Sequence, residues 1–226
     1  KITGDANCDE LMHAGEAELN IVQCAGSMTW LARRMEEDMG IPYIKVSFFG
    51  IEDTSQSLLR IAQALGDREA EKKARQLIAR ETRALEPVLR QSREVLGGKK
   101  AAIYVGGGFK AISLIKQFRE IGMETVVVGT QTGKKEDYDV ISSLVRDGTV
   151  VLDDANPAEL EYFIREKQAD VLVGGVKERP LAYKLGVAFL DHNHERRHPL
   201  AGFEGVRNFV RELNLSVNSP VWQYVR

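Results

Sequence analysis

Five short and almost uninterrupted apolar segments recur in the second half of the chain, and polar or amphipathic stretches separate them. They span residues 101–105, 125–129, 149–153, 170–174 and 187–191. Strands that are apolar at every position are typical of a parallel sheet that is buried on both faces. The stretches between them have helical spacing, which predicts crossover helices covering those faces. The pattern therefore predicts an α/β fold with a five-stranded parallel sheet flanked by helices.

The first 97 residues show a less regular version of the same pattern. Apolar residues at helical spacing between 67 and 96 predict one long amphipathic helix, or two helices broken near Pro87. The chain begins without Met at Lys1, so we expect the N-terminal domain to be incomplete. We predict two Rossmann-like domains, a partial one over 1–97 and a complete one over 98–226. In the first, we expect helices over 5–17, 27–40 and 54–65 and strands over 19–24 and 43–49.

Composition excludes several classes of protein. The chain has 226 residues and a formal net charge of −2, so it offers no electrostatic basis for general nucleic-acid binding. No run of about 20 apolar residues is present for a membrane span. Two cysteines, Cys8 and Cys24, are too few for a disulfide framework, and no signal peptide opens the sequence. We therefore expect a cytoplasmic protein.

Ligands of open parallel sheets bind at the carboxyl ends of the strands, so the residues after each strand are the candidates for a site. Gly106 and Gly107 follow the strand 101–105, and Lys110 lies beside them. Ala111 stands where a dinucleotide fingerprint needs its third glycine, which argues against such a cofactor. The glycines either bring backbone N–H groups close to an anion or form a tight turn. Lys177 and Arg179, after strand 170–174, either pair with a carboxylate or phosphate or are solvated.

Two further segments follow predicted strands. Cys24 ends the strand 19–24 immediately before a predicted helix, where the helix dipole favours a thiolate. Such a residue is a metal or cluster ligand, a nucleophile, or simply a small buried side chain. His192, Asn193 and His194 follow the last strand, in a segment that also contains two arginines. The positive charge of the two arginines disfavours a lone zinc site and favours a polar wall that faces an anionic ligand. The sequence contains no motif of a known catalytic triad, P-loop or zinc protease.

Several motifs closely resemble the nitrogenase component 1 family. They occur in the family's order along essentially the whole chain. Within that family the chain most resembles the scaffold subunit on which the iron–molybdenum cofactor is assembled. The motifs are LNIVQCAGSMTWLARRMEEDMG, KKAAIYVGG, EIGMETVVVGTQ, GGVKER and FLDHNHERRHPLAGFEG.

The resemblance implies roles for individual residues. Cys24 matches the cysteine whose thiolate ligates the family's cofactor. In the catalytic α subunit, a histidine after the last strand is the second protein ligand, and our alignment places Asn193 at that position. The cluster would then have one firm protein bond and would be easier to release. The remaining members of the polar shell around it would be Gly106, Gly107, Lys110, Lys177, His192 and His194.

The resemblance also implies a role in nitrogen fixation as a biosynthetic scaffold and not as a turnover enzyme. The scaffold would form an α2β2 heterotetramer with NifN and receive an all-iron iron–sulfur precursor from NifB. Molybdenum and homocitrate would be inserted with the nitrogenase Fe protein, and the mature FeMo cofactor would pass to the apo-nitrogenase MoFe protein. We expect no bound cluster in this stretch alone, because the missing domain would close the site.

Two alternatives remain open at this point. The chain resembles the α subunit of a catalytic nitrogenase of the molybdenum or vanadium type, although Asn193 speaks against that reading. A small-anion-binding Rossmann-like module is the other alternative, and it has no use for Cys24.

Overall fold

The computed structural model describes residues 6–23, 26, 28–193 and 198–224. The chain forms two compact units, and each is described by itself. The first comprises Lys1–Phe48 and Ser55–Ile78, and the second comprises Phe49–Thr54 and Ala79–Arg226.

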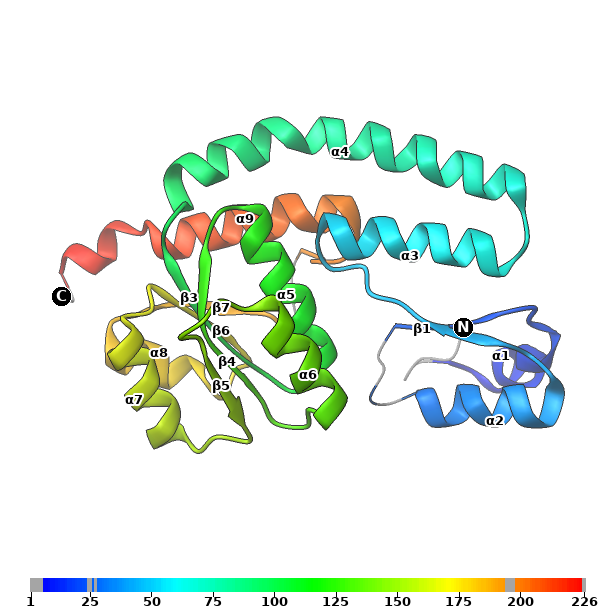
Figure 1. Cartoon of the computed structure of the whole chain (residues 1–226), viewed down its shortest axis with the longest axis horizontal. Coiled ribbons are helices and arrows are strands. Elements are labelled where there is room, and N and C mark those ends of the chain that lie inside the picture. Colours follow the sequence, from blue (N-terminus) through cyan, green and yellow to red (C-terminus); the bar gives the residue numbers. More distant parts are fainter. Residues whose placement is uncertain (1–5, 24–25, 27, 194–197, 225–226) are drawn as a thin grey trace. The chain divides into compact units, whose positions relative to one another are not determined.

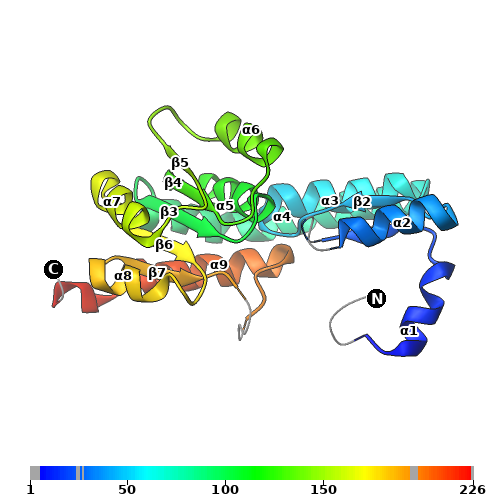
Figure 2. The ribbon, with the colours of Figure 1, turned by 90° about the horizontal axis from the view of Figure 1, so that it is seen from below.

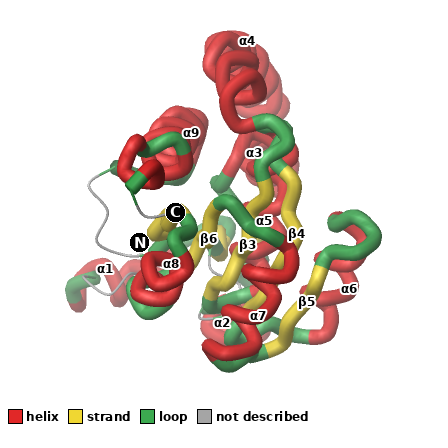
Figure 3. Tube along the Cα trace, turned by 90° about the vertical axis from the view of Figure 1, so that its left-hand side faces the viewer, coloured by secondary structure: helices red, strands yellow, loops and turns green. Residues whose placement is uncertain are grey.

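A five-stranded sheet forms the centre of the second unit, with the order β5-β4-β3-β6-β7 and every pair parallel. Figure 3 shows β6, β3, β4 and β5 side by side. The prediction of a five-stranded parallel sheet is thus confirmed, and each strand agrees with the predicted bounds to within one residue. The strands are β3 (Lys100–Val105), β4 (Glu124–Thr130), β5 (Val150–Asp153), β6 (Val171–Gly174) and β7 (Ala188–Asp191).

Helices cover both faces of this sheet (Figure 1). Alternate side chains of β3 point to opposite faces, as the pleat of a strand requires. Ala101, Ile103 and Val105 join the apolar cluster with α5 and α9, whereas Ala102 and Tyr104 join the cluster with α7 and α8. In Figure 2, α8 and α9 lie beside β7. The helices are α5 (Gly108–Glu120), α6 (Lys135–Leu144), α7 (Pro157–Lys167), α8 (Arg179–Leu185) and α9 (Gly202–Val217), and a 3-10 turn, η2 (Pro220–Gln223), follows.

The long helix α4 (Arg68–Leu96) continues through Pro87 without a break. Of the two predicted alternatives, the single helix is therefore correct. Leu85 and Leu89 flank the proline and are buried in the core of the second unit, so packing holds the helix together where one backbone hydrogen bond is missing. This packing also groups residues 79–97 with the second unit. The predicted domain boundary between residues 97 and 98 stays a prediction.

The first unit contains a two-stranded parallel sheet with short helices beside it. Both strands are shorter than predicted, and the first predicted helix is an α-helical turn followed by a 3-10 turn. The elements are α1 (Cys8–Met12), η1 (His13–Glu16), β1 (Asn20–Val22), α2 (Thr29–Met39) and β2 (Tyr43–Lys45), and α3 (Gly50–Ala64) follows in the chain.

Helix α3 begins at Gly50, four residues before the predicted start at Thr54. The reason is a cap that comes from elsewhere in the chain. The carboxylate of Glu120, at the end of α5, accepts hydrogen bonds from the backbone N–H groups of Ile51 at 3.0 Å and Glu52 at 2.9 Å. These are first-turn donors that a local side chain usually satisfies. Burial raises the pKa of the Glu120 carboxyl. Among the described residues, no helix has the length and apolar character needed to cross a membrane.

The packing of α4 can be tested with two neighbouring residues. Leu96 is fully buried, whereas the side chain of Val95 is 44% exposed. We expect Leu96→Ala to lower the free energy of unfolding by about 2–5 kcal/mol, because it leaves a cavity in the second unit. We expect Val95→Ala to change it by less than about 1 kcal/mol. Chemical denaturation of both variants measures the difference, and equal losses would contradict the assignment of this end of α4 to the core.

Candidate functional site

The order of the strands creates one natural position for a ligand in the second unit. From β3 the chain proceeds to β4 and β5, and it then returns to place β6 on the other side of β3. The loops that leave β3 and β6 therefore diverge to opposite faces, and such a switch point is where open parallel sheets bind their ligands. Gly106 and Gly107 follow β3, Gly175 and Lys177 follow β6, and Asn193 comes after β7.

Each of the three glycines after β3 has a different structural role. The carbonyl oxygen of Gly106 accepts hydrogen bonds from the backbone N–H and the hydroxyl of Thr132, both at 2.7 Å. A Cβ atom at Gly106 would meet no atom within 4 Å, whereas one at Gly108 would overlap with Asp137 of α6. Gly108 is thus required by helix packing, and Gly106 leaves open space. Gly107 is the N-cap of α5 and provides no capping side chain, so the first N–H groups of this helix are available to an anion.

Lys110 reaches across the carboxyl end of β6 to the segment after β7. Its ammonium donates hydrogen bonds to the carbonyl oxygen of His192 at 3.0 Å and to Oδ1 of Asn193 at 3.4 Å. Gly175 lies next to the same amide, because a Cβ atom there would overlap with Nδ2 of Asn193. The structure therefore brings together residues that follow three different strands.

The charged residues of the loop after β6 have different environments. Arg179 forms an ion pair with Asp191 at 2.8 Å and lies over the ring of Phe189. The carboxylate of Glu178 accepts a hydrogen bond from the N–H of Gly175 at 2.8 Å. Lys177 is exposed, and within the described part of the chain its ammonium makes no hydrogen bond or ion pair. Lys177 is therefore available to an anionic ligand at this edge.

The ring of His192 is buried, with 2% of the residue exposed. Its centroid lies 5.0 Å from that of Phe49 and 6.3 Å from that of Phe209, both in edge-to-face geometry. Its carbonyl oxygen accepts the hydrogen bond from Lys110, and its backbone N–H donates to the carbonyl oxygen of Gly174 at 2.9 Å. A contact between its ring and a ligand stays a prediction. Cys24 and His194, which were also predicted to belong to the site, lie outside the described residues.

Polar side chains close the neighbouring part of the same sheet edge. The hydroxyl of Tyr138 donates to Oδ1 of Asp153 at 2.7 Å and lies 2.7 Å from the hydroxyl of Thr130. Burial, together with the nearby Asp153 carboxylate, raises the pKa of the Tyr138 phenol. These groups satisfy one another, so the open part of the edge is the one at β3, β6 and β7.

Sequence reasoning singled out Arg179 as a partner for a carboxylate or phosphate, but it assigned no role to Gly175 or Asp191. The signals were present, since Gly175 belongs to a glycine pair after a strand and Asp191 ends the last strand. The pairing of Asp191 with Arg179 depends on the strand order, which the sequence pattern does not specify. Among the described residues, no group of three or more His, Cys, Asp and Glu side chains is arranged to hold a metal ion.

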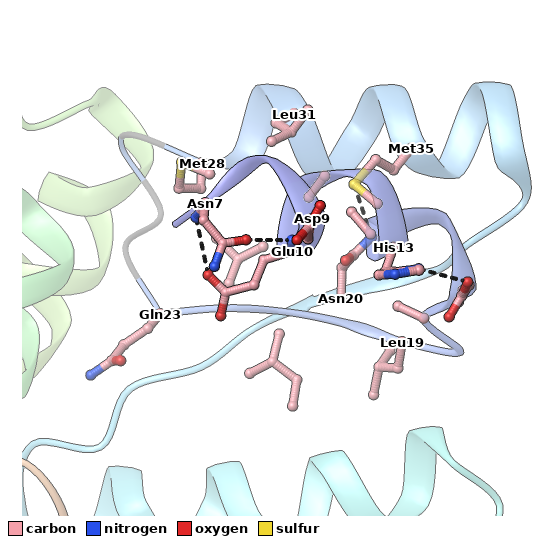
Figure 4. A pocket seen from close by; sticks show the side chains of 16 residues that line it. Asn7, Asp9, Glu10, His13, Leu19, Asn20, Gln23, Met28, Leu31 and Met35 are labelled. Carbon is pink, nitrogen blue, oxygen red and sulfur yellow. Dashed lines mark hydrogen bonds and ion pairs between the residues drawn. The ribbon is translucent and has the colours of Figure 1, made fainter. Parts of the chain in front are cut away.

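The first unit contains a separate cavity of about 1010 Å³ between α1, β1 and α2 (Figure 4). Several polar side chains on its wall make hydrogen bonds to neighbouring side chains. Nδ1 of His13 lies 3.0 Å from the Glu16 carboxylate, and Nδ2 of Asn20 donates to the sulfur of Met35 at 3.6 Å. Gln23, which directly precedes Cys24, also lines this cavity. The cavity wall is mixed in character, with apolar side chains from β1 and α2.

A comparison with known protein families agrees with the fold and with the glycines that follow its strands. Residues 1–218 match the family described as nitrogenase component 1 type oxidoreductase. The chain therefore belongs to the nitrogenase component 1 family, as the sequence motifs indicated.

Individual relatives refine this assignment. The chain is 64% identical to the nitrogenase iron-molybdenum cofactor biosynthesis protein NifE of Clostridium pasteurianum, over 100% of this chain and 49% of that protein. It is 36% identical to the nitrogenase molybdenum-iron protein alpha chain of Methanothermobacter marburgensis, over 97% of this chain and 46% of that protein. A solved structure of nitrogenase Cp1 at pH 6.5 superposes with a TM-score of 0.87 and 27% identity, over 99% of this chain and 53% of that one. The chain thus spans about half the length of the relatives it matches.

The two kinds of glycine in the loop after β3 provide a matched test. Gly108→Ala should lower the free energy of unfolding by about 1–3 kcal/mol, because its methyl group overlaps with Asp137. Gly106→Ala should change it by about 0.5 kcal/mol or less, since the space around Gly106 is open. Thermal or urea unfolding distinguishes the two, and a large loss of stability in Gly106→Ala would show that this glycine is structural.

Proposed function

We propose that the chain belongs to a scaffold subunit on which the iron–molybdenum cofactor of nitrogenase is assembled. The observation that carries the proposal is the exposed Asn193 at the end of β7, among Lys110, Gly175 and the other residues of the open sheet edge. An amide is a poor ligand for iron, whereas an imidazole is a good one. The 64% and 53% identities to two proteins named NifE, over the whole chain, support the same function.

The cargo of such a scaffold is an anionic iron–sulfur precursor, which needs one firm bond and a shell of donors. Cys24 supplies the thiolate bond. The backbone around Gly106 and Gly107 supplies N–H groups at the start of α5, and Lys177 supplies positive charge. Lys110, His192, Asn193 and His194 complete the polar shell. Homocitrate, a polyanion, would be held by the same donors when molybdenum is inserted.

The proposal includes partners that a cytoplasmic scaffold of this kind requires. NifN would complete an α2β2 heterotetramer, NifB would donate the all-iron precursor, and the nitrogenase Fe protein would assist insertion of molybdenum and homocitrate. The mature FeMo cofactor would then pass to the apo-nitrogenase MoFe protein. Chemistry at this site is therefore cluster maturation and transfer, and not turnover of a small substrate.

Two alternatives have an observation in their favour. The 36% identity to a nitrogenase alpha chain favours a catalytic subunit of the molybdenum or vanadium type. The N-terminus of α5, without a capping side chain, favours a small-anion-binding module. The higher identity to the NifE proteins weighs against the first, and a module of the second kind gives Cys24 no role.

The thiolate bond is tested by Cys24→Ser. We expect the variant complex, purified without oxygen, to lose most of its iron and sulfide, because the covalent anchor is gone. Folding should be nearly intact, since the exchange of one sulfur atom for oxygen costs only about 1–2 kcal/mol. Cys8→Ser, at an exposed position, is the matched control and should retain the cluster. Full iron content with an unchanged cluster spectrum in Cys24→Ser would exclude Cys24 as the ligand.

Transfer is tested by Asn193→His. The imidazole would add a second bond to the cluster, so the loaded complex should activate apo-nitrogenase more slowly while its iron content stays the same. Asn193→Gln is the matched control, because it keeps the amide. An unchanged rate of activation, together with spectroscopic evidence that the new imidazole binds iron, would contradict the idea that a single anchor permits release.

A further inference from the structure

We propose that Lys110 is a positioning residue, and that it turns the carboxamide of Asn193 so that its NH₂ group, and not its oxygen, is offered to an anionic ligand. This inference rests on the proposed function. It assigns Lys110 a role different from that of Lys177. Lys177 stays available to the ligand, whereas the Lys110 ammonium is committed to the segment after β7.

The first argument concerns the place of Lys110 in its helix. It lies in the first turn of α5, where the helix dipole disfavours a positive charge. Its ammonium nevertheless extends to oxygens that are 82 and 83 residues away in the sequence, the carbonyl oxygen of His192 at 3.0 Å and Oδ1 of Asn193 at 3.4 Å. Hydrogen bonds from a charged donor are stronger than neutral ones, so these contacts offset the unfavourable position.

The second argument concerns the other sides of Asn193. Its backbone N–H donates to Oδ1 of Asp191 at 2.9 Å, and Oδ2 of Asp191 pairs with Arg179 of α8 at 2.8 Å. Its Nδ2 lies where a side chain at Gly175 would be. The residue is therefore held at its backbone, at its oxygen and beside its nitrogen by residues that follow β3, β6 and β7.

The chemical consequence follows from the atoms that an amide offers. Only the oxygen of a carboxamide is a useful metal ligand, whereas the NH₂ group is a hydrogen-bond donor. With the oxygen directed to Lys110, Asn193 presents its NH₂ donors to an anionic cluster. The contact that Asn193 makes to the cluster is then a hydrogen bond, which is weaker than a metal–ligand bond and easier to break on transfer.

The clamp is tested first on the protein without cluster, by amide hydrogen exchange in the assembled complex. Lys110→Met should speed exchange at the N–H of Asn193 about tenfold or more, because a charged hydrogen bond that restrains the segment is lost. Lys110→Arg should restore most of the protection, and Lys177→Met should leave it unchanged. Gly175→Ala, which displaces Nδ2, should also speed exchange. Unchanged exchange in both Lys110→Met and Gly175→Ala would overturn the clamp.

The consequence for the ligand is tested on the loaded complex. In Lys110→Met the carboxamide is free to turn, so the cluster loses a hydrogen-bond donor, which should change its paramagnetic resonance spectrum and speed its release to apo-nitrogenase. Lys110→Arg should keep the spectrum and the rate of the unsubstituted complex. A spectrum and rate in Lys110→Met identical to those of the unsubstituted protein, with exchange at Asn193 raised, would overturn the donor role of Asn193. If no variant, including the unsubstituted complex, takes up iron, the proposed function and the donor role both fail, and the exchange result alone decides the clamp.

Discussion

The parallel pairing of β3 with β6 is the constraint on which the site of the second unit depends. Both strands are buried on both faces, so the interior of the sheet has no room for polar chemistry. The pairing also makes the two loops that leave these strands diverge to opposite faces, and open parallel sheets bind their ligands at such a point. Gly106, Gly107 and Gly175 lie in these two loops. The charged residues of the site belong to these loops and to the end of β7.

A scaffold for a cluster must satisfy two opposing requirements, since it has to hold its cargo and also release it. Metal–ligand bonds hold tightly, whereas hydrogen bonds and charge hold a polyanion with many weaker contacts. The described edge of the sheet is rich in the second kind of contact. It offers the first N–H groups of α5, the Lys177 ammonium and the Asn193 amide. This balance agrees with a site for assembly and transfer.

Much of this fold could be predicted from the sequence because the strands are continuous apolar runs. The five strands of the second unit could be predicted in this way, and the glycines after β3 could be located because they directly follow one of these strands. The early start of α3 could not be predicted, because its cap is Glu120, which is 69 residues from Ile51. The burial of the His192 ring could not be predicted either, since it depends on Phe49 and Phe209 from distant segments. The resemblance named Lys110 and Asn193 individually, but their mutual contact follows only from the order of the strands.

Anaerobic metal analysis of the assembled complex tests the central claim most directly. The complex would be purified from cells that lack the apo-nitrogenase acceptor, so that cargo accumulates. The account predicts bound iron and sulfide that move to added apo-nitrogenase and activate it, without reduction of acetylene or dinitrogen by the complex itself. A complex that reduces these substrates, or one that contains neither iron nor sulfide under these conditions, would contradict the account.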